Sequence, residues 1–319
     1  MRIGLVVDAT CDLPQDFLQK HRIPVLPIRI HLAGQSLMDR RVPQATQAFY
    51  RDLLPKVGSE DRSEPLQVAE MQEWFLETLV TRFDQVLCLT LSAQRSLIFE
   101  HATQASFGLL QRYRERRAAA GVAGHFAMRV LDGGNIFAGT AVLAAEAIRL
   151  IGDGAHPNSL RARLEQLSGQ VCTFLVPDDL GHLRRRGFRK GERGGLIDHL
   201  RGAALGLGSL LDVKPVISVQ QGEDKPVSLA PSFDKAAEKL LAHARARVLA
   251  GDLLAPQLCM SFAGELSQVR DLPGFAELEA ACGERGVTLH LAMLSPTGAI
   301  NLGPGALSLA FAAPPVGFS

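Results

Sequence analysis

Short apolar runs alternate along the first half of the chain with longer segments in which apolar residues recur every three or four positions. The short runs predict β-strands at residues 3–7, 25–30, 86–91 and 126–131. The longer segments predict helices at residues 14–21, 44–54, 66–82, 94–112 and 136–151. Strands that alternate with helices in this way are typical of an α/β fold whose mostly parallel sheet is flanked by helices.

The pattern changes after residues 152–157 (GDGAHP), a turn-forming stretch, and one more predicted helix at residues 159–167. We therefore place a domain boundary near Ser168, which gives an N-terminal α/β domain at residues 1–168 and a C-terminal α+β domain at residues 169–319. The second domain has predicted strands at residues 171–176, 213–219, 258–262, 288–294 and 306–311, and predicted helices at residues 233–249 and 275–285. This order of elements favours a more mixed sheet.

The composition is that of a soluble globular protein, with 47% hydrophobic and 21% charged residues. The 34 basic and 33 acidic residues nearly cancel, so the whole-chain charge gives no argument for a nucleic acid or a membrane surface as partner. No apolar stretch reaches the roughly 20 residues of a membrane-spanning helix, and the N-terminus lacks the apolar core of a signal peptide. Five widely spaced cysteines fit a reducing compartment, so we expect a cytoplasmic protein with no membrane insertion.

Common catalytic and cofactor motifs are missing from the sequence. It contains no GxGxxG, GxxxxGK[ST], GxSxG or HExxH, and its nine histidines show no metal-ligand spacing. We accordingly predict no catalytic residue, no metal and no cofactor. The densest basic stretch, residues 182–193, is either a set of phosphate contacts or a solvated loop, and the near-zero net charge favours the loop.

Polar residues follow the predicted strands at the edge where open parallel sheets bind ligands. Asp12 is placed to cap a helix that has Pro14 in its first turn. The two carboxylates that flank Cys11 argue against that thiol as a nucleophile, because they raise its pKa. Ser92 and Ser96 open the helix after the third strand, where hydroxyls and free N–H groups either bind an anion or simply cap the helix.

Five segments carry a distinctive set of motifs: residues 8–14 (DATCDLP), 62–65 (RSEP), 92–99 (SAQRSLIF), 211–217 (LDVKPVI) and 299–305 (AINLGPG). Asp39, Phe49 and Tyr50 lie between the first two segments. Together these residues resemble the DegV family of fatty acid-binding (FakB-type) proteins, from residue 3 to about residue 311. The corresponding family patterns are DST-x-DLP, TSQP, SSxLSGTY, LxIKPxL and GTHTGPG, and the first match is the most specific.

The resemblance implies a two-domain α/β protein that holds one long-chain fatty acid between its domains and acts as a carrier rather than an enzyme. It implies an apolar tunnel for the acyl chain and a carboxylate site of hydroxyl and amide groups. The positions that match this carboxylate site are Ser63, Ser92, Ser96 and Asn301. Arg62 or Arg95 would supply a positive charge. In relatives that serve a fatty acid kinase, the carrier presents the carboxylate to that separate ATP-dependent subunit, which is therefore a candidate partner.

Three of the departures from the family patterns bear on the head-group site and the second domain. Asn301 replaces a histidine, Arg62 replaces the first threonine of TSQP, and Phe262 replaces a further histidine of the second domain. An amide still donates hydrogen bonds and an arginine still pairs with a carboxylate, so these changes alter the head-group site without abolishing it. Burying about 14 methylenes contributes about 11 kcal/mol before ordering costs, whereas each charged hydrogen bond contributes about 1.5–3 kcal/mol.

Two other classes of function stay open at this point. The helix start at residues 92–96 and the three arginines at residues 184–186 fit an enzyme or regulator that acts on a small phosphorylated or acyl ligand. Residues 184–193 would suit a module that contacts nucleic acid, although Phe188 is the only aromatic residue among them. The identity of a co-purified ligand would discriminate among the three hypotheses.

Overall fold

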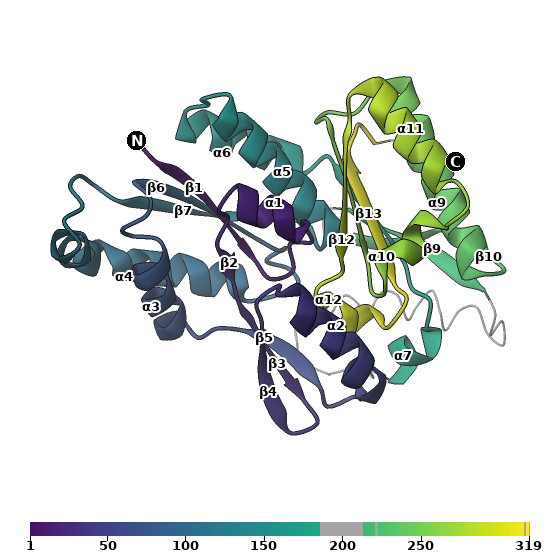
Figure 1. Ribbon diagram of the computed structural model, residues 1–319, viewed down its shortest axis with the longest axis horizontal. Coiled ribbons are helices and arrows are strands. Elements are labelled where there is room, and N and C mark those ends of the chain that lie inside the picture. Colours follow the sequence, from purple (N-terminus) through teal and green to yellow (C-terminus); the bar gives the residue numbers. More distant parts are fainter. Residues whose placement is uncertain (186–212, 221–222, 316, 319) are drawn as a thin grey trace.

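The computed structural model describes residues 1–185, 213–220, 223–315 and 317–318 (Figure 1). These residues form a four-stranded, a three-stranded and a six-stranded sheet. The four-stranded sheet comes from the first half of the chain and the six-stranded sheet from the second half. The predicted fold class, a parallel α/β sheet joined to a second unit of mixed α and β structure, is therefore confirmed.

The four-stranded sheet is entirely parallel, in the order β2-β1-β6-β7. Its strands are β1 (Ile3–Asp8), β2 (Val25–Leu26), β6 (Gln85–Thr90) and β7 (Ala127–Asp132). The helices of this half are α1 (Gln15–Lys20), α3 (Val68–Thr78), α4 (Ile98–Ala119), α5 (Ala138–Gly152) and α6 (Pro157–Ser168). Val6 of β1 shares an apolar core with Phe75 of α3, whereas Leu5 and Val7 share another with Val142 of α5. Because alternate side chains of a strand point to opposite faces, helices cover both sides of the sheet.

A small antiparallel sheet has the order β4-β3-β5. Its elements are β3 (Ile28–Leu32), β4 (Gln35–Asp39) and β5 (Arg62–Pro65), with α2 (Pro43–Asp52) and the 3-10 turn η1 (Leu54–Lys56) between the last two strands. The single strand predicted at residues 25–30 is wrong, because Pro27 separates β2 from β3 and offers no N–H to a sheet. The β3–β4 hairpin turns at Ala33 and Gly34, both with positive φ, as a two-residue turn of this kind requires.

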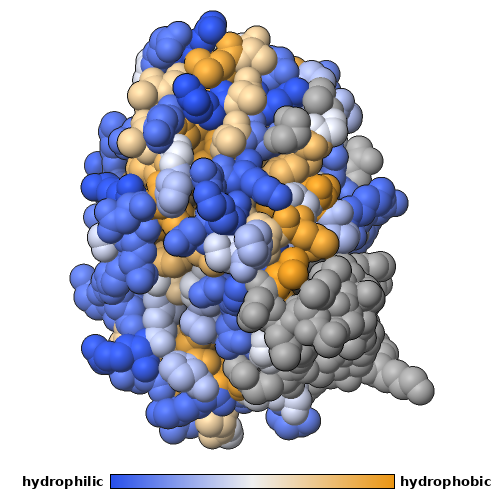
Figure 2. All heavy atoms as spheres, turned by 90° about the vertical axis from the view of Figure 1, so that its right-hand side faces the viewer, coloured by the Kyte–Doolittle hydropathy of each residue, from blue (hydrophilic) through white to orange (hydrophobic). Residues whose placement is uncertain are grey.

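The six-stranded sheet is mixed, in the order β10-β9-β8-β13-β11-β12. Only β11 and β12 run parallel, and the other neighbouring strands of this sheet are antiparallel. The strands are β8 (Val171–Val176), β9 (Lys214–Gln220), β10 (Glu223–Ala230), β11 (Gln257–Phe262), β12 (Thr288–Met293) and β13 (Leu307–Ala312). The helices beside it include α9 (Phe233–Ala250), α10 (Leu266–Arg270) and α11 (Phe275–Arg285). The face of this unit turned to the viewer in Figure 2 is mostly hydrophilic, with separate apolar patches.

Helix α5 lies between the two larger sheets (Figure 1). Its residues share one apolar core with Leu5 and Leu87 of the four-stranded sheet and with Cys259 and Ala310 of the six-stranded sheet. Every strand of the first sheet precedes Ser168 and every strand of the six-stranded sheet follows it. Because α5 packs against both sheets, the division into domains at that residue stays a prediction.

Four further features of the described residues bear on function. All five cysteines are free, and four of them are buried. No group of three or more His, Cys, Asp or Glu side chains in this part of the chain is arranged to hold a metal ion. Within the same residues, no helix is both long enough and apolar enough to cross a membrane.

Buried polar groups gather where the two halves of the chain meet.

Candidate functional site

Strand β5 contacts both α4 and the short helix α12 (Pro296–Leu302), so three distant parts of the sequence meet beside it. Ser63 lies within β5 and is half-buried. Ser96 lies two residues before α4, and Asn301 lies within α12. The Nδ1 of His101 in α4 is 2.8 Å from the carbonyl oxygen of Leu66, just after β5. Strand β5 with Ser63 therefore contacts both the helix that carries Asn301 and the helix that begins just after Ser96, while the role of each ligand stays a prediction.

The two serines before α4 bond to backbone groups of the chain that leads into the helix. Helix α4 begins at Ile98 rather than at residue 94, so the alternative that Ser92 is its N-cap is wrong. The Oγ of buried Ser92 accepts from the N–H of Gln94 at 3.3 Å, and the backbone N–H of Ser92 donates to the Asn135 carbonyl. The Oγ of Ser96 accepts from the N–H of Ile98 at 3.2 Å. A hydroxyl that accepts a hydrogen bond still carries an O–H donor, which suits a carboxylate.

Both arginines expected to provide positive charge have acidic partners. The Nε of Arg62 lies 3.6 Å from Oε2 of Glu64 on the same strand, and 44% of the Arg62 side chain is exposed. The Nη2 of Arg95 lies 2.5 Å from Oδ1 of Asp224 in β10, and both of these side chains are buried. We call this second contact the Arg95–Asp224 bridge. The bridge joins the two halves of the molecule and pairs the Arg95 charge with a carboxylate. The Arg62 side chain, in contrast, is partly exposed to solvent.

The Asn301 side-chain amide already makes one hydrogen bond within helix α12. The Nδ2 of Asn301 donates to the Thr297 carbonyl one turn earlier, at 2.8 Å. His182 of helix α7 (Leu180–Arg185), to which sequence reasoning gives no role at this site, is buried against α12 with Nε2 3.0 Å from the Ile300 carbonyl oxygen. A Cβ on Gly303 would lie 3.0 Å from the His182 Cγ, so this close approach requires glycine. Residues 186–193 of the predicted basic stretch lie outside the described residues.

Two buried carboxylates from the first half of the chain hold the start of α12. Oδ1 of Asp12 accepts from the N–H of Ser295 at 2.9 Å, and its Oδ2 accepts from the Ser261 hydroxyl at 2.6 Å. Oδ2 of Asp39 accepts from both the N–H and the hydroxyl of Thr297, at 3.0 and 2.8 Å. We call these five residues the α12 anchor. Because each carboxylate oxygen named here meets a donor from the second half, the anchor fixes where α12 lies.

The predicted role of Asp12 as a cap of the helix that follows it is wrong. Helix α1 begins at Gln15, and no side chain caps it. The Asp12 carboxylate instead serves α12, whose Ser295 is 283 positions away in the sequence. Tyr50 of α2 adds a further link, because its hydroxyl donates to the Leu294 carbonyl. A tertiary contact has thus replaced the local capping that the residue type favours.

Arg41 lies directly beside the α12 anchor. Its Nη1 is 3.3 Å from Oδ1 of Asp12, and its Nη2 donates to the Met293 carbonyl at 2.8 Å. The backbone N–H of Arg41 donates to Oδ1 of Asp39 at 3.1 Å. Sequence reasoning missed this residue, since nothing in the pattern distinguishes buried Arg41 from the exposed Arg40 that precedes it.

Burial is the largest cause of the raised pKa values of the acidic groups near the start of α12. It raises the pKa of Asp12 to about 6, although Arg41 and the hydrogen-bond donors act in the opposite direction. Burial is also the main cause of the raised pKa values of Asp8 and Asp39. The pKa of the Cys11 thiol is raised well above its usual value, first by burial and then by the neighbouring carboxylates. The carboxylates therefore act on Cys11 in the predicted direction, while burial is the larger cause.

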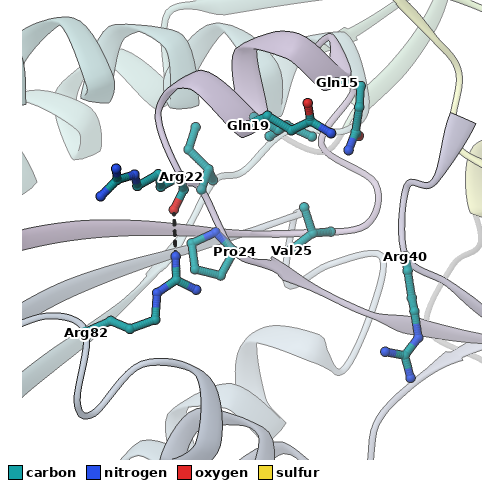
Figure 3. A pocket seen from close by; sticks show the side chains of 9 residues that line it. Gln15, Gln19, Arg22, Pro24, Val25, Arg40 and Arg82 are labelled. Atoms are coloured by element: carbon teal, nitrogen blue, oxygen red, sulfur yellow. Dashed lines mark hydrogen bonds between the residues drawn. The ribbon is translucent and has the colours of Figure 1, made fainter.

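A surface hollow of about 230 Å³ lies beside α1 and β2 (Figure 3). Its lining includes three exposed arginines, Arg22, Arg40 and Arg82, together with Gln15 and Gln19. Arg82 donates to the Arg22 carbonyl at 3.4 Å, while Figure 3 shows the Arg40 side chain well apart from this pair. The three positive charges do not converge on one point, and none of the predicted carboxylate ligands lines this hollow.

Comparisons with known proteins agree over nearly the whole chain. The model of a family described as "Uncharacterised protein, DegV family" matches residues 2–314. A DegV domain-containing protein of Xanthomonas campestris pv. campestris is 45% identical over 320 residues, which cover 100% of both chains. A DegV lipid-binding protein of Thermotoga maritima has a similar structure, with a TM-score of 0.73, 19% identity and coverage of 98% of this chain and 99% of that one. A stearic acid-binding protein of Eubacterium ventriosum gives the same TM-score and identity, over 98% of both chains.

Proposed function

Because the chain belongs to the DegV family, we propose that it binds one long-chain fatty acid, with the carboxylate in the region where β5, α4 and α12 meet. The observation that carries the proposal is the likeness, over 98% of this chain, to a fold whose solved examples include proteins described as lipid-binding and stearic acid-binding. The contact of β5 with both helices supports the location, because Ser63 lies in β5, Asn301 lies in α12, and Ser96 lies just before α4.

The proposed partners of the carboxylate are Ser63, Ser92, Ser96 and Asn301, with Arg62 as the partly exposed positive charge. A hydrogen bond to a charged group contributes about 1.5–3 kcal/mol. Each buried methylene of the acyl chain contributes about 0.8 kcal/mol, so a long chain outweighs any single polar contact. In this arrangement the acyl chain sets the affinity and the polar groups set the orientation of the head group.

The proposed role is that of a carrier rather than an enzyme. It is supported by the solved relatives named above, which are described as binding proteins. The proposed partner is a separate fatty acid kinase that phosphorylates the presented carboxylate, supported by the resemblance of residues 62–65 and 92–99 to the family motifs. The cytoplasm is the proposed compartment, supported by five free cysteines.

Organic extraction of the purified protein, followed by mass spectrometry, tests the binding proposal. We expect about one equivalent of a long-chain fatty acid per chain, exchangeable for added stearic acid, because the ligand is held without a covalent bond. A protein that carries no lipid and shows no saturable uptake of any long-chain acid would refute the proposal.

A further inference from the structure

We propose that Arg41 is a positioning residue for the head-group site, because its charge allows two buried carboxylates, Asp12 and Asp39, to hold the start of α12. The inference rests on the proposed function, since α12 carries Asn301, a proposed partner of the ligand carboxylate. Arg41 itself is not expected to touch the fatty acid.

The backbone conformation directs the Arg41 side chain toward the contact between the two halves of the chain. Arg41 lies two residues after Asp39, the last residue of β4. Its φ is 58°, a left-handed conformation that is uncommon for residues other than glycine. The Arg41 side chain is 5% exposed, whereas the preceding Arg40 is exposed and lines the surface hollow. Such a conformation persists only where the surrounding contacts determine it. Two successive arginines therefore serve different surfaces.

Charge contributes more to this contact than hydrogen bonding does. Nη2 of Arg41 donates to the Met293 carbonyl, but Nε and Nη1 donate no hydrogen bond to any residue that the structure describes. Nη1 nevertheless lies 3.3 Å from Oδ1 of Asp12, where the Coulomb attraction is strong because water is excluded. A lysine at this position would keep the charge, so the structure predicts that lysine substitutes better than an apolar residue.

Arg41 is the positively charged group among those that interact with Asp12. The others are the neighbouring Cys11, Asp39 of β4, Tyr50 of α2, Cys259 and the donor Ser261 of β11, and the donor Ser295 just before α12. Asp8 interacts in turn with Asp39 and Cys11. Among these groups of the described chain, Arg41 carries the positive charge and the others are acidic or neutral.

The loss of this charge has a pH dependence whose sign follows from the carboxylates. The pKa of Asp12 is raised to about 6 although Arg41 lowers it, so removing Arg41 raises the pKa further. When the pKa of a carboxyl is raised in the folded protein, stability is lost as the pH rises from the unfolded pKa to the raised folded pKa. A further rise of the Asp12 pKa without Arg41 therefore extends this loss to higher pH. A protonated carboxyl needs no counter-charge. Substitution of Arg41 should therefore be tolerated at low pH and harmful at high pH, whereas loss of packing alone has no such dependence.

Three variants test this inference with stearic acid as the probe: Arg41→Met removes the charge, Arg41→Lys keeps it, and Arg40→Met is the matched control on the exposed neighbour. The dissociation constant is measured for each from about pH 5.5 to about pH 8 and divided by the wild-type value at the same pH, which cancels the titration of the ligand. We expect the ratio for Arg41→Met to rise at least about tenfold across this range. The ratio should stay nearly constant for Arg41→Lys and close to one for Arg40→Met.

A ratio for Arg41→Met that does not change with pH would overturn the inference, as would an equal rise for Arg41→Lys. If the wild-type protein binds no stearic acid, the proposed function fails instead. In that case the thermal midpoints of the same variants across the same pH range still decide the role of Arg41. The inference then requires a loss at high pH in Arg41→Met that Arg41→Lys restores.

Discussion

Two of the buried polar contacts that join the halves of this protein are built differently. The Arg95–Asp224 bridge brings together two full charges, on side chains that are 5% and 1% exposed. The α12 anchor distributes two carboxylates over backbone and hydroxyl donors from Ser261, Ser295 and Thr297. Removing one partner of a buried ion pair leaves an uncompensated charge, whereas a set of hydrogen bonds loses one bond at a time. Loss of one partner of the bridge should therefore cost more stability than loss of one hydrogen-bond donor of the anchor.

The two contacts also border different parts of the candidate site. Ser96 directly follows Arg95, so the bridge lies next to the chain that leads into α4. Asn301 lies one turn after Thr297, so the anchor lies at the start of the helix that carries this amide. The comparison indicates that the bridge mainly secures the association of the two halves, while the anchor sets the position of one wall of the site.

The largest effect is expected at the bridge. Asp224→Ala leaves the buried Arg95 guanidinium without this carboxylate and should lower the free energy of unfolding by about 3–5 kcal/mol. Denaturant unfolding measures the change. The matched control is Glu223→Ala on the same strand, whose side chain is 69% exposed and whose loss should change stability by at most about 1 kcal/mol. Equal losses of unfolding free energy in the two variants would show that the bridge contributes no more to stability than an exposed surface pair.

A smaller effect is expected in the anchor. Thr297→Val removes the hydroxyl that donates to Asp39 and leaves the backbone N–H in place, so it should lower the free energy of unfolding by about 1.5–3 kcal/mol. Thr288→Val, at the exposed first residue of β12, is the control and should change the free energy of unfolding by less than about 0.5 kcal/mol. A loss in Thr297→Val as large as that in Asp224→Ala would remove the distinction between the two contacts.

On the bridge side of the site, Ser96→Ala should weaken fatty acid binding by about 1–3 kcal/mol, the scale for losing a hydrogen bond to a charged group. A titration with stearic acid measures the change in affinity. Ser106→Ala, farther along α4, is the control, because its hydroxyl donates to the Thr103 carbonyl. If affinity is unchanged in Ser96→Ala, the hydroxyl serves only the backbone at Ile98.

On the anchor side, the smallest expected effect is a pH profile. The Asn301 amide should add no pH dependence of its own to wild-type affinity between about pH 6 and 8, because an amide does not titrate there. Asn301→His should add tighter binding below the imidazole pKa, where a charge-assisted hydrogen bond becomes available. Binding curves across this pH range decide the matter. Identical profiles for both proteins would remove Asn301 from the site and leave Ser63 and Ser96 as the candidates.

The sequence predicts most closely the strands that are buried over nearly their whole length. Strands β8 and β11 lie within the predicted segments or one residue from them, because most of their residues are apolar. Strand β5 (RSEP) is not predicted, since its residues are polar and end in proline. Strand β10 is missed for a similar reason, because it lies at the edge of its sheet and contains charged residues and Pro226.

The site is less accessible to sequence reasoning than the fold. Family motifs point to Ser63, Ser96 and Asn301, and the structure places their elements in contact. The anchor could not be derived, because its hydrogen bonds join residues from opposite ends of the chain, and local capping rules assign Asp12 to the wrong helix. Arg41 is missed because burial, rather than residue type, gives it a role.

The proposed fatty acid site lies where β5, α4 and α12 meet. It is tested by a calorimetric titration of the delipidated protein with stearic acid, repeated on Ser96→Ala and Arg40→Met. We expect saturable one-to-one binding that Ser96→Ala weakens and that Arg40→Met, in the surface hollow, leaves unchanged. Absence of saturable binding, or binding that is lost in Arg40→Met and intact in Ser96→Ala, would contradict it.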